Sequence, residues 1–323
     1  MRQWEKWECQ AVTGAFPNLR ILSIKDCRKL KGQLPKLLVP LEKLRIRECQ
    51  QLEGFAPRAL ELKLHDCGKV QLDWATMEWL RMGWHNMEAS FSESDGSHTL
   101  DELEIEGSLM TQTPLMTFPL DSFPTVTKLV LSTFGNLQMI SLDQARHDLE
   151  DLTINKCPKL ESLPANMHVL LPSLWKLLII DCPRIESFPN GGLPSNLEEM
   201  KLINCSRLIG SLKGAFRDRS SLESLWIEEL DAKCFPDEGL LPFSLTSLTI
   251  RDCPNLEKLD YKGLYQLSSL KLLILVNCPN LQCLPEEGLP RSISDFCITN
   301  CPLLEQRCRN EGGEDWDRNL HIL

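Results

Sequence analysis

The segment that decides the fold runs from residue 174 to residue 189 and reads LWKLLIIDCPRIESFP. Its apolar side chains follow a fixed spacing, at Leu174, Leu177, Ile179, Cys182, Ile185 and Phe188. Leu177 and Ile179 are two residues apart, so on an extended strand both point to the same side. The segment therefore predicts one short strand with a buried face, followed by a turn that brings the later apolar residues back beneath it.

The same spacing recurs along almost the whole chain. Its first position falls on Leu19, Leu41, Ala59, Leu100, Val126, Leu149, Leu174, Leu197, Leu222, Leu245, Leu270 and Ile293. The one long interval, from Ala59 to Leu100, is expected to hide a degenerate unit that starts at Met77. A period in the twenties with the pattern L-x-x-L-x-L-x-x-N/C-x-L is the signature of leucine-rich repeats.

The repeats predict an α/β solenoid: a leucine-rich-repeat arc of about 12–13 coils, with a parallel sheet on the concave side and a mostly irregular or short-helical convex side. We expect a partial repeat at residues 1–18, the repeat array at 19–305 and a C-terminal cap at 306–323. The array is expected to be irregular around 68–125, with an exposed loop at 90–97.

Two kinds of return segment alternate from Leu149 onward, in units of 25 and 23 residues. The shorter units return through Gly-Leu-Pro-type stretches, where proline excludes a long helix. The longer units use stretches such as residues 260–267, which can form a short helical turn.

Nine of the 14 cysteines occupy the same phase of the repeat: Cys27, Cys49, Cys67, Cys157, Cys182, Cys205, Cys253, Cys278 and Cys301. A disulfide framework rarely places each cysteine at one phase of a hydrophobic pattern, whereas a packing role does. The other five show no CxxC pair and no histidine at zinc-finger spacing. We therefore expect buried, reduced thiols, and predict neither a metal nor a cofactor.

Composition narrows the class of protein. A net charge of -10 argues against a nucleic-acid partner and against binding to an anionic membrane. The longest fully apolar stretch, Leu272 to Val276, is far shorter than a membrane-spanning helix. The first residues lack the apolar core of a signal peptide, so we expect a cytoplasmic or nucleo-cytoplasmic protein. The six histidines are dispersed over different coils, which predicts no catalytic arrangement and no enzyme.

Outward-facing strand positions are the candidate binding residues. Most of them are polar, but one set is apolar: Trp175, Leu178, Ile180, Ile203, Trp226, Ile274 and Val276. Exposed apolar patches that contain tryptophan mark interaction surfaces. The alternative is that these side chains pack on each other or on a neighbouring loop.

Charge is segregated in the first coils. A basic group comprises Lys25, Lys43, Arg45, Arg47, Lys63 and His65, and an acidic strand follows at Asp101, Glu102, Glu104 and Glu106. The basic face is a candidate docking surface for another domain, with Lys25, Arg45, Arg47 and Lys63 as its main residues. The alternative is an ordinary solvated face.

Three motifs resemble one protein family. WEKWE at residues 4–8, followed by FPNL at 16–19, is similar to a stretch in its repeat region. Cys-Pro pairs follow five of the predicted strands, as in its later repeats. The end of the chain, from CPLLEQRC at 301–308 to LHI at 320–322, looks like its terminal cap. The chain thus resembles the C-terminal leucine-rich-repeat region of plant nucleotide-binding leucine-rich-repeat (NLR) disease resistance proteins of the coiled-coil class.

This resemblance implies a protein-interaction module that recognises pathogen effectors or their host targets and restrains a nucleotide-binding switch domain. The basic face would then dock that domain. The chain contains no G-x-x-x-x-G-K-[ST] phosphate loop, so the family's nucleotide switch cannot be assigned to any residue. We expect a C-terminal portion of such a receptor, or a gene encoding only that portion, with an N-terminal edge prone to association.

Two other functions remain open on the residues alone. One is the substrate-recognition repeat arm of a ubiquitin-ligase adaptor, which would need a helical module for the ligase. The other is a secreted or cell-surface repeat receptor, which would need a signal peptide and several glycosylation sequons. Repeat architecture alone does not assign function.

Overall fold

The computed structural model describes residues 4–7, 16–34, 41–72, 77–83, 99–109, 115–216, 220–310 and 320–322. The chain divides into two compact units. Unit 1 comprises Met1–Pro114 and Leu120–Gly135, and unit 2 comprises Leu115–Pro119 and Asn136–Leu323. The predicted loop at 90–97 lies outside the described residues.

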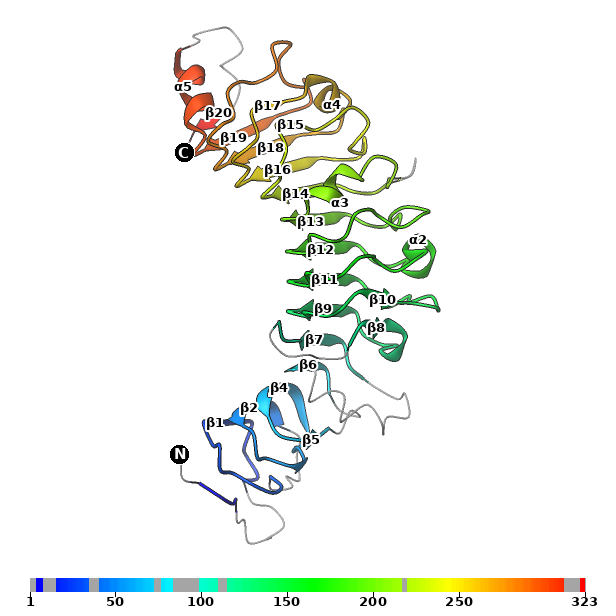
Figure 1. Cartoon of the computed structure of the whole chain (residues 1–323), viewed down its shortest axis with the longest axis vertical. Helices are drawn as coiled ribbons and strands as arrows, with labels where there is room; N and C mark the ends of the chain where they lie inside the picture. Colours follow the sequence, from blue (N-terminus) through cyan, green and yellow to red (C-terminus); the bar gives the residue numbers. More distant parts are fainter. Residues whose placement is uncertain are drawn as a thin grey trace. The chain divides into compact units, whose positions relative to one another are not determined.

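Unit 1 contains a parallel sheet whose strands follow one another in chain order (Figure 1). These strands are β1 (Ile21–Lys25), β2 (Leu41–Cys49), β4 (Ala59–Cys67), β6 (Trp79–Gly83), β7 (Glu102–Glu106) and β9 (Lys128–Ser132). The short strands β3 (Gly54–Phe55) and β5 (Val70–Gln71) pair with each other, and one 3₁₀ turn, η3, spans Leu120–Ser122. The predicted degenerate repeat unit that starts at Met77 is confirmed, because its strand, β6, pairs with β4 and with β7.

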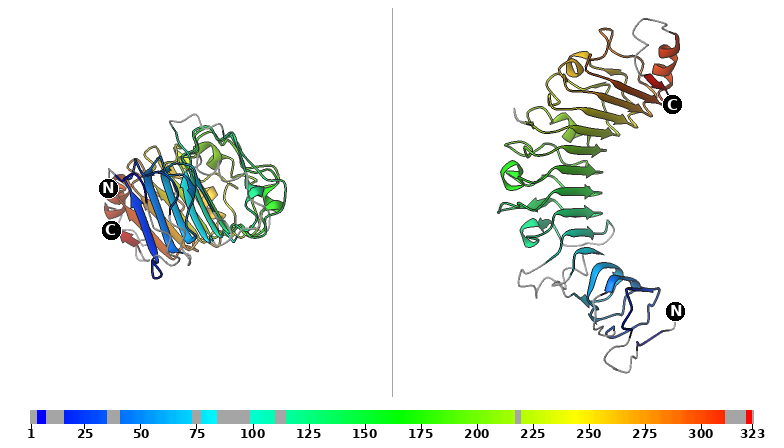
Figure 2. Two further views of the ribbon diagram at one scale, coloured as in Figure 1. Left: turned by 90° about the horizontal axis from the view of Figure 1, so that it is seen from below. Right: turned by 180° about the vertical axis from the view of Figure 1, so that it is seen from behind.

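Unit 2 contains a second series of parallel strands in chain order. They are β11 (Asp151–Asn155), β12 (Lys176–Ile180), β13 (Glu199–Ile203), β14 (Ser224–Glu228), β16 (Ser247–Arg251), β18 (Leu272–Val276), β19 (Asp295–Thr299) and β20 (Leu320–Ile322). Figure 2 shows these strands stacked along one side of the unit and the return segments along the other.

The return segments of unit 2 hold its remaining elements. Two short parallel pairs occur there, β8 (Thr117–Pro119) with β10 (Met139–Ser141) and β15 (Cys234–Phe235) with β17 (Lys258–Leu259). The helices are α2 (Met167–Leu170), α3 (Ser206–Gly210), α4 (Tyr261–Tyr265) and α5 (Pro302–Asn310). No helix in the described parts of the chain is long and apolar enough to cross a membrane.

The predicted repeat register is confirmed in both units. From β6 onward, each main-sheet strand up to β19 begins two residues after a predicted first position, as β12 begins two residues after Leu174. Along β12, Leu177 and Ile179 are fully buried while their neighbours are half-buried. These fully buried, inward-facing strand residues must be covered by the adjacent coils, because a single coil is too small to bury them. The structure is therefore a leucine-rich-repeat solenoid.

The two kinds of return segment behave as the sequence predicts. Each 25-residue unit from Leu149 onward contains one of the short helices α2, α3 and α4. The 23-residue units turn instead through Gly192, Gly239 and Gly288, whose φ angles of 84°, 74° and 88° favour glycine. Helix α4 also requires Gly263, where an added Cβ would collide with the carbonyl oxygen of Pro236.

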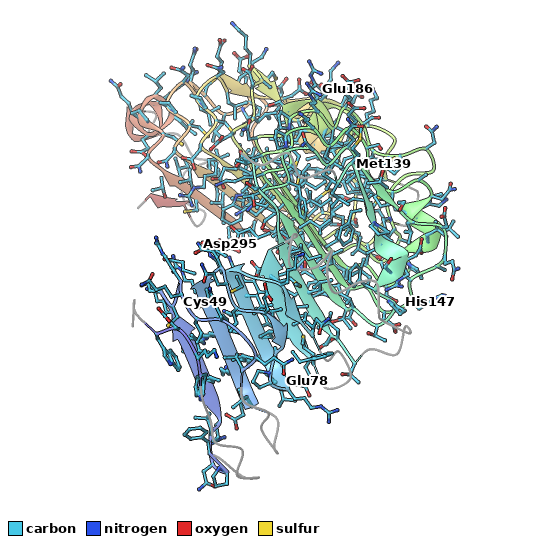
Figure 3. All side chains as sticks on the ribbon, turned by 60° about the horizontal axis from the view of Figure 1, so that its bottom comes forward. Cys49, Glu78, Met139, His147, Glu186 and Asp295 are labelled. Atoms are coloured by element: carbon cyan, nitrogen blue, oxygen red, sulfur yellow. The ribbon has the colours of Figure 1, made fainter. Side chains whose placement is uncertain are left out.

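The nine repeat cysteines share one environment. Each thiol donates a hydrogen bond to the carbonyl oxygen two residues earlier, at 3.1–3.6 Å. All nine are free thiols, and all except the half-buried Cys67 are buried. This confirms the predicted packing role; Cys49, labelled in Figure 3, shows the position at the end of β2.

The residue before each of these cysteines has a left-handed backbone. Its φ angle lies between 50° and 57°, from Asp26 before Cys27 to Asn300 before Cys301. Aspartate and asparagine tolerate this conformation better than most residues. Their side chains also connect coils, since the amide of Asn277 donates to Asp252 at 2.7 Å and Asn300 donates to Asn277 at 2.9 Å. Each strand of the cysteine type therefore ends in the same turn.

Replacing Leu248 with alanine should lower the free energy of unfolding by about 2–5 kcal/mol, because a fully buried leucine leaves a cavity in a stacked core. Urea unfolding of unit 2 measures this cost. Ser247→Ala is the control, since that half-buried side chain faces outward on the same strand. Equal losses from the two substitutions would contradict the inward and outward assignment.

Alkaline pH should destabilise the fold through its thiols. Burial raises the pKa of Cys205 from 9.0 to about 11. The unfolded thiol therefore loses its proton first, so this stabilisation is complete below pH 9 and is lost as the pH rises to 11. Unfolding of the intact chain and of Cys205→Ala at several pH values should give slopes that differ by about 1.4 kcal/mol per pH unit. Identical slopes would show that the Cys205 thiol does not contribute to the pH dependence of the free energy of unfolding.

Candidate functional site

The outward side chains of unit 2 form rows across its sheet, because neighbouring strands are paired in register. The middle row runs through Leu178, Lys201, Trp226, Thr249 and Ile274. The row beside it, at the carboxyl ends of the strands, runs through Ile180, Ile203, Glu228, Arg251 and Val276. Parallel strands lie about 4.8 Å apart, so side chains adjacent in a row are within reach of each other.

Four of the predicted binding residues come together on β12, β13 and β14. Ile180 lies opposite Ile203, and Leu178 and Trp226 lie on either side of Lys201. All four are half-buried on the outward face, and none belongs to the core. We call these four residues, Leu178, Ile180, Ile203 and Trp226, the apolar strip.

The other predicted strand residues form a separate patch. Ile274 and Val276 lie on β18, and β16 separates them from the apolar strip. Leu272 precedes them on the same face, a position that the continuous apolar run at 272–276 could have indicated. Thr249 on β16 is only 6% exposed, between Trp226 and Ile274 in the middle row.

Strand β16 separates the two patches with polar side chains. Arg251 at its end pairs with the neighbouring Asp252 at 2.8 Å. Burial would raise the pKa of the Asp252 carboxyl, but hydrogen bonds from Asn277 and Arg251 outweigh it and hold that pKa below its usual value. A charged group therefore interrupts the apolar surface beside Val276.

Trp175 lies beside the apolar strip rather than within it. It precedes β12 by one residue, and its carbonyl oxygen accepts hydrogen bonds from the backbone N–H groups of Glu198 and Glu199. Its side chain is 38% exposed at the edge where the strands begin. The sequence pattern placed Trp175 in the binding set because it directly precedes the strand residues.

Trp226 is held in place by two polar neighbours. The Nζ of Lys201 lies 4.1 Å from the centroid of the indole ring, within cation–π range. The indole N–H donates to Glu228 Oε2 at 3.0 Å, and Lys201 and Glu228 form an ion pair at 3.9 Å. Sequence reasoning missed both. Lys201 is found only through the pairing of β13 with β14, whereas Glu228, two residues after Trp226 on the same strand, could have been found from alternation along β14.

The predicted basic residues lie on one face of unit 1. Arg45 is opposite Lys63, and Arg47 lies between Lys25 and His65. We call these five residues the basic cluster. Lys63 also lies 4.6 Å from the ring centroid of Trp79, and Arg47 contacts Glu48 at 3.1 Å.

The predicted acidic strand, β7, is different because cations from both neighbouring strands reach it. Arg81 on β6 contacts Glu104 at 3.2 Å and Glu106 at 3.7 Å. Lys128 on β9 contacts Glu102 at 3.4 Å. Two cations thus contact three of the four carboxylates of the acidic strand, whereas Lys25, Arg45 and Lys63 form no ion pair within the described residues.

Comparisons with known proteins point to plant disease resistance proteins. A putative disease resistance protein of Arabidopsis thaliana, At3g14460, is 31% identical over 160 residues, covering 49% of this chain and 11% of that protein. Disease resistance protein RPS6 of the same plant is 27% identical over 214 residues, covering 64% of this chain and 17% of RPS6. This chain therefore spans less than a fifth of the length of either relative.

Two further comparisons add little. No family model matches the chain. A leucine-rich repeat protein from Eubacterium ventriosum aligns over 85% of this chain and 88% of its own, at 11% identity and a TM-score of 0.22. The repeat pattern and the parallel sheet make the chain a leucine-rich-repeat solenoid, and the two plant proteins give it distant similarity to disease resistance proteins.

The two tryptophans should differ in their effect on stability. Trp226→Ala should cost roughly 1–2 kcal/mol, because it removes the contact with Lys201 and the hydrogen bond to Glu228. Trp175→Ala should stay within about 0.5 kcal/mol, because its ring is more exposed and its cation, Lys176 Nζ, lies farther from the ring centroid, at 5.7 Å. Thermal unfolding of both variants tests this, and Trp226→Phe should fall between them. A larger loss from Trp175→Ala would reverse the assignment.

Proposed function

We propose that this chain is the protein-recognition region of an intracellular plant immune receptor of the NLR class. It recognises a pathogen effector, or the host protein that the effector modifies, through the strand face of unit 2. The observation that carries the proposal is the apolar strip on the outward face of a repeat whose relatives are disease resistance proteins.

The apolar strip has the properties of a protein-binding surface. It combines three aliphatic side chains with a tryptophan, the residue type that most often anchors an interface. Lys201 and Glu228 fix the indole before any partner arrives, so less conformational entropy is lost on binding. Lys201 lies within the strip, between Leu178 and Trp226, and Glu228 lies beside Ile203, so the strip offers charged contacts next to its apolar side chains.

Restraint of a switch domain is the second part of the proposal. In a complete receptor, the basic cluster docks the nucleotide-binding domain through Lys25, Arg45, Arg47 and Lys63. The Cys-Pro pairs and the CPLLEQRC motif support the coiled-coil class of these receptors, and such a receptor acts in the cytoplasm. The two surfaces lie in different units, so they can be tested separately.

The test measures binding of purified pathogen effectors, one at a time, by biolayer interferometry. For an effector that binds, Ile203→Asp and Trp226→Ala should each weaken the affinity at least tenfold, because they remove the centre of the apolar strip. Val169→Asp is the matched control, since Val169 is 59% exposed on helix α2, away from the strands.

Loss of binding in Val169→Asp but not in the apolar-strip variants would overturn the proposed face. The same assay with a receptor's nucleotide-binding domain supplied in trans should show the opposite dependence. Arg45→Glu should then abolish binding, and Trp226→Ala should leave it unchanged. A nucleotide-binding domain that binds Arg45→Glu normally would contradict the docking role.

A further inference from the structure

The basic cluster is an array of basic side chains on adjacent, paired strands. Arg45 and Lys63 are adjacent in the middle row of β2 and β4, and Arg81 on β6 continues that row. Lys25, Arg47 and His65 form the row beside it, on β1, β2 and β4. The strand face of unit 1 therefore presents six basic side chains in two parallel rows.

The nearby carboxylates are already occupied. Glu61, on the same face, is paired with Lys43 at 2.8 Å. Glu104 and Glu106 are paired with Arg81, and Glu48 lies beside Arg47. Within the described parts of the chain, Lys25, Arg45 and Lys63 form no ion pair. No ion pair within the described residues offsets their mutual repulsion, which a bound anion would relieve.

The spacing of the cations distinguishes between kinds of anion. Neighbours in a row are about 4.8 Å apart at the backbone, and the two rows are about 6.6 Å apart. An extended acidic peptide repeats its carboxylates on one face about every 6.6–6.8 Å. Crossing the strands, it would not match the spacing of about 4.8 Å within a row, and running along a strand it would meet only two basic side chains of the cluster. A nucleic-acid strand would continue along the rows onto Glu102, Glu104 and Glu106 of β7.

We propose that the basic cluster binds a compact small anion that carries several phosphate groups. Phosphate groups carry more charge per volume than carboxylates, so one compact anion can contact several of these basic side chains at once. Arg45 and Arg47 offer two planar guanidinium groups, which match pairs of phosphate oxygens, and Lys63 supplies a further point charge. This site is separate from the proposed recognition surface in unit 2. It uses the residues that we propose dock a nucleotide-binding domain, so anion binding is measured in the absence of that domain.

Isothermal titration calorimetry of the full chain with inorganic tripolyphosphate tests this inference. We expect saturable binding at one site that weakens as the salt concentration rises. The double substitution Arg45→Gln and Lys63→Gln should weaken it at least tenfold. Arg207→Gln is the control, because Arg207 is an exposed arginine of unit 2 paired with Glu186, and it should leave the affinity unchanged.

Circular dichroism and thermal unfolding should show that every variant remains folded. The absence of saturable binding to the intact chain would overturn the inference, as would equal weakening by the Arg207→Gln control. A hexaglutamate peptide serves as the competing ligand. If it bound more tightly than tripolyphosphate, the surface would be a site for acidic polypeptides and the phosphate assignment would be wrong.

Discussion

Pairing of each strand with the next coil is the constraint on which the rest of the structure depends. A coil of 23 or 25 residues cannot bury Leu177 and Ile179, or their equivalents, by itself, and they become fully buried only because adjacent coils cover them. The turn after the strand keeps the coils aligned. In that turn, a residue with a left-handed backbone precedes a cysteine whose thiol donates a hydrogen bond to its own strand. The strand of each coil of this type therefore ends in the same turn.

Strict register also creates the candidate surfaces. Because strands align residue by residue, an outward side chain has fixed neighbours in its row, and chemistry absent from any single coil appears between coils. Lys201 and Trp226 lie on different strands, yet they form one unit with Glu228. The basic cluster arises in the same way from three strands that each contribute one or two cations. Such surfaces are properties of the stack.

The sequence predicts inward and outward directions well and lateral neighbours poorly. The repeated spacing of apolar residues located the strands, including the strand of the unit that starts at Met77, because alternation along a strand is a local property. The thiol environment was equally predictable, because one phase recurred nine times. Trp175 was misplaced into the strand face, and the interruption by Thr249 and Arg251 was not foreseen, because both depend on where a strand starts and on which strand pairs with it. The contact of Lys201 with Trp226 required the register between β13 and β14, whereas Glu228 was within reach of local alternation.

The alternation of return segments has a consequence for how such a chain can change over generations. A coil with a short helix always neighbours a coil that turns through glycine and proline, from Leu149 to Ile293. Duplication or deletion of one 25-residue coil together with its 23-residue neighbour preserves that alternation. Loss of a single coil instead places two return segments of the same kind next to each other. Genetic exchange in units of two coils is therefore the step that this architecture tolerates best. Each such step moves the outward residues of two neighbouring strands together.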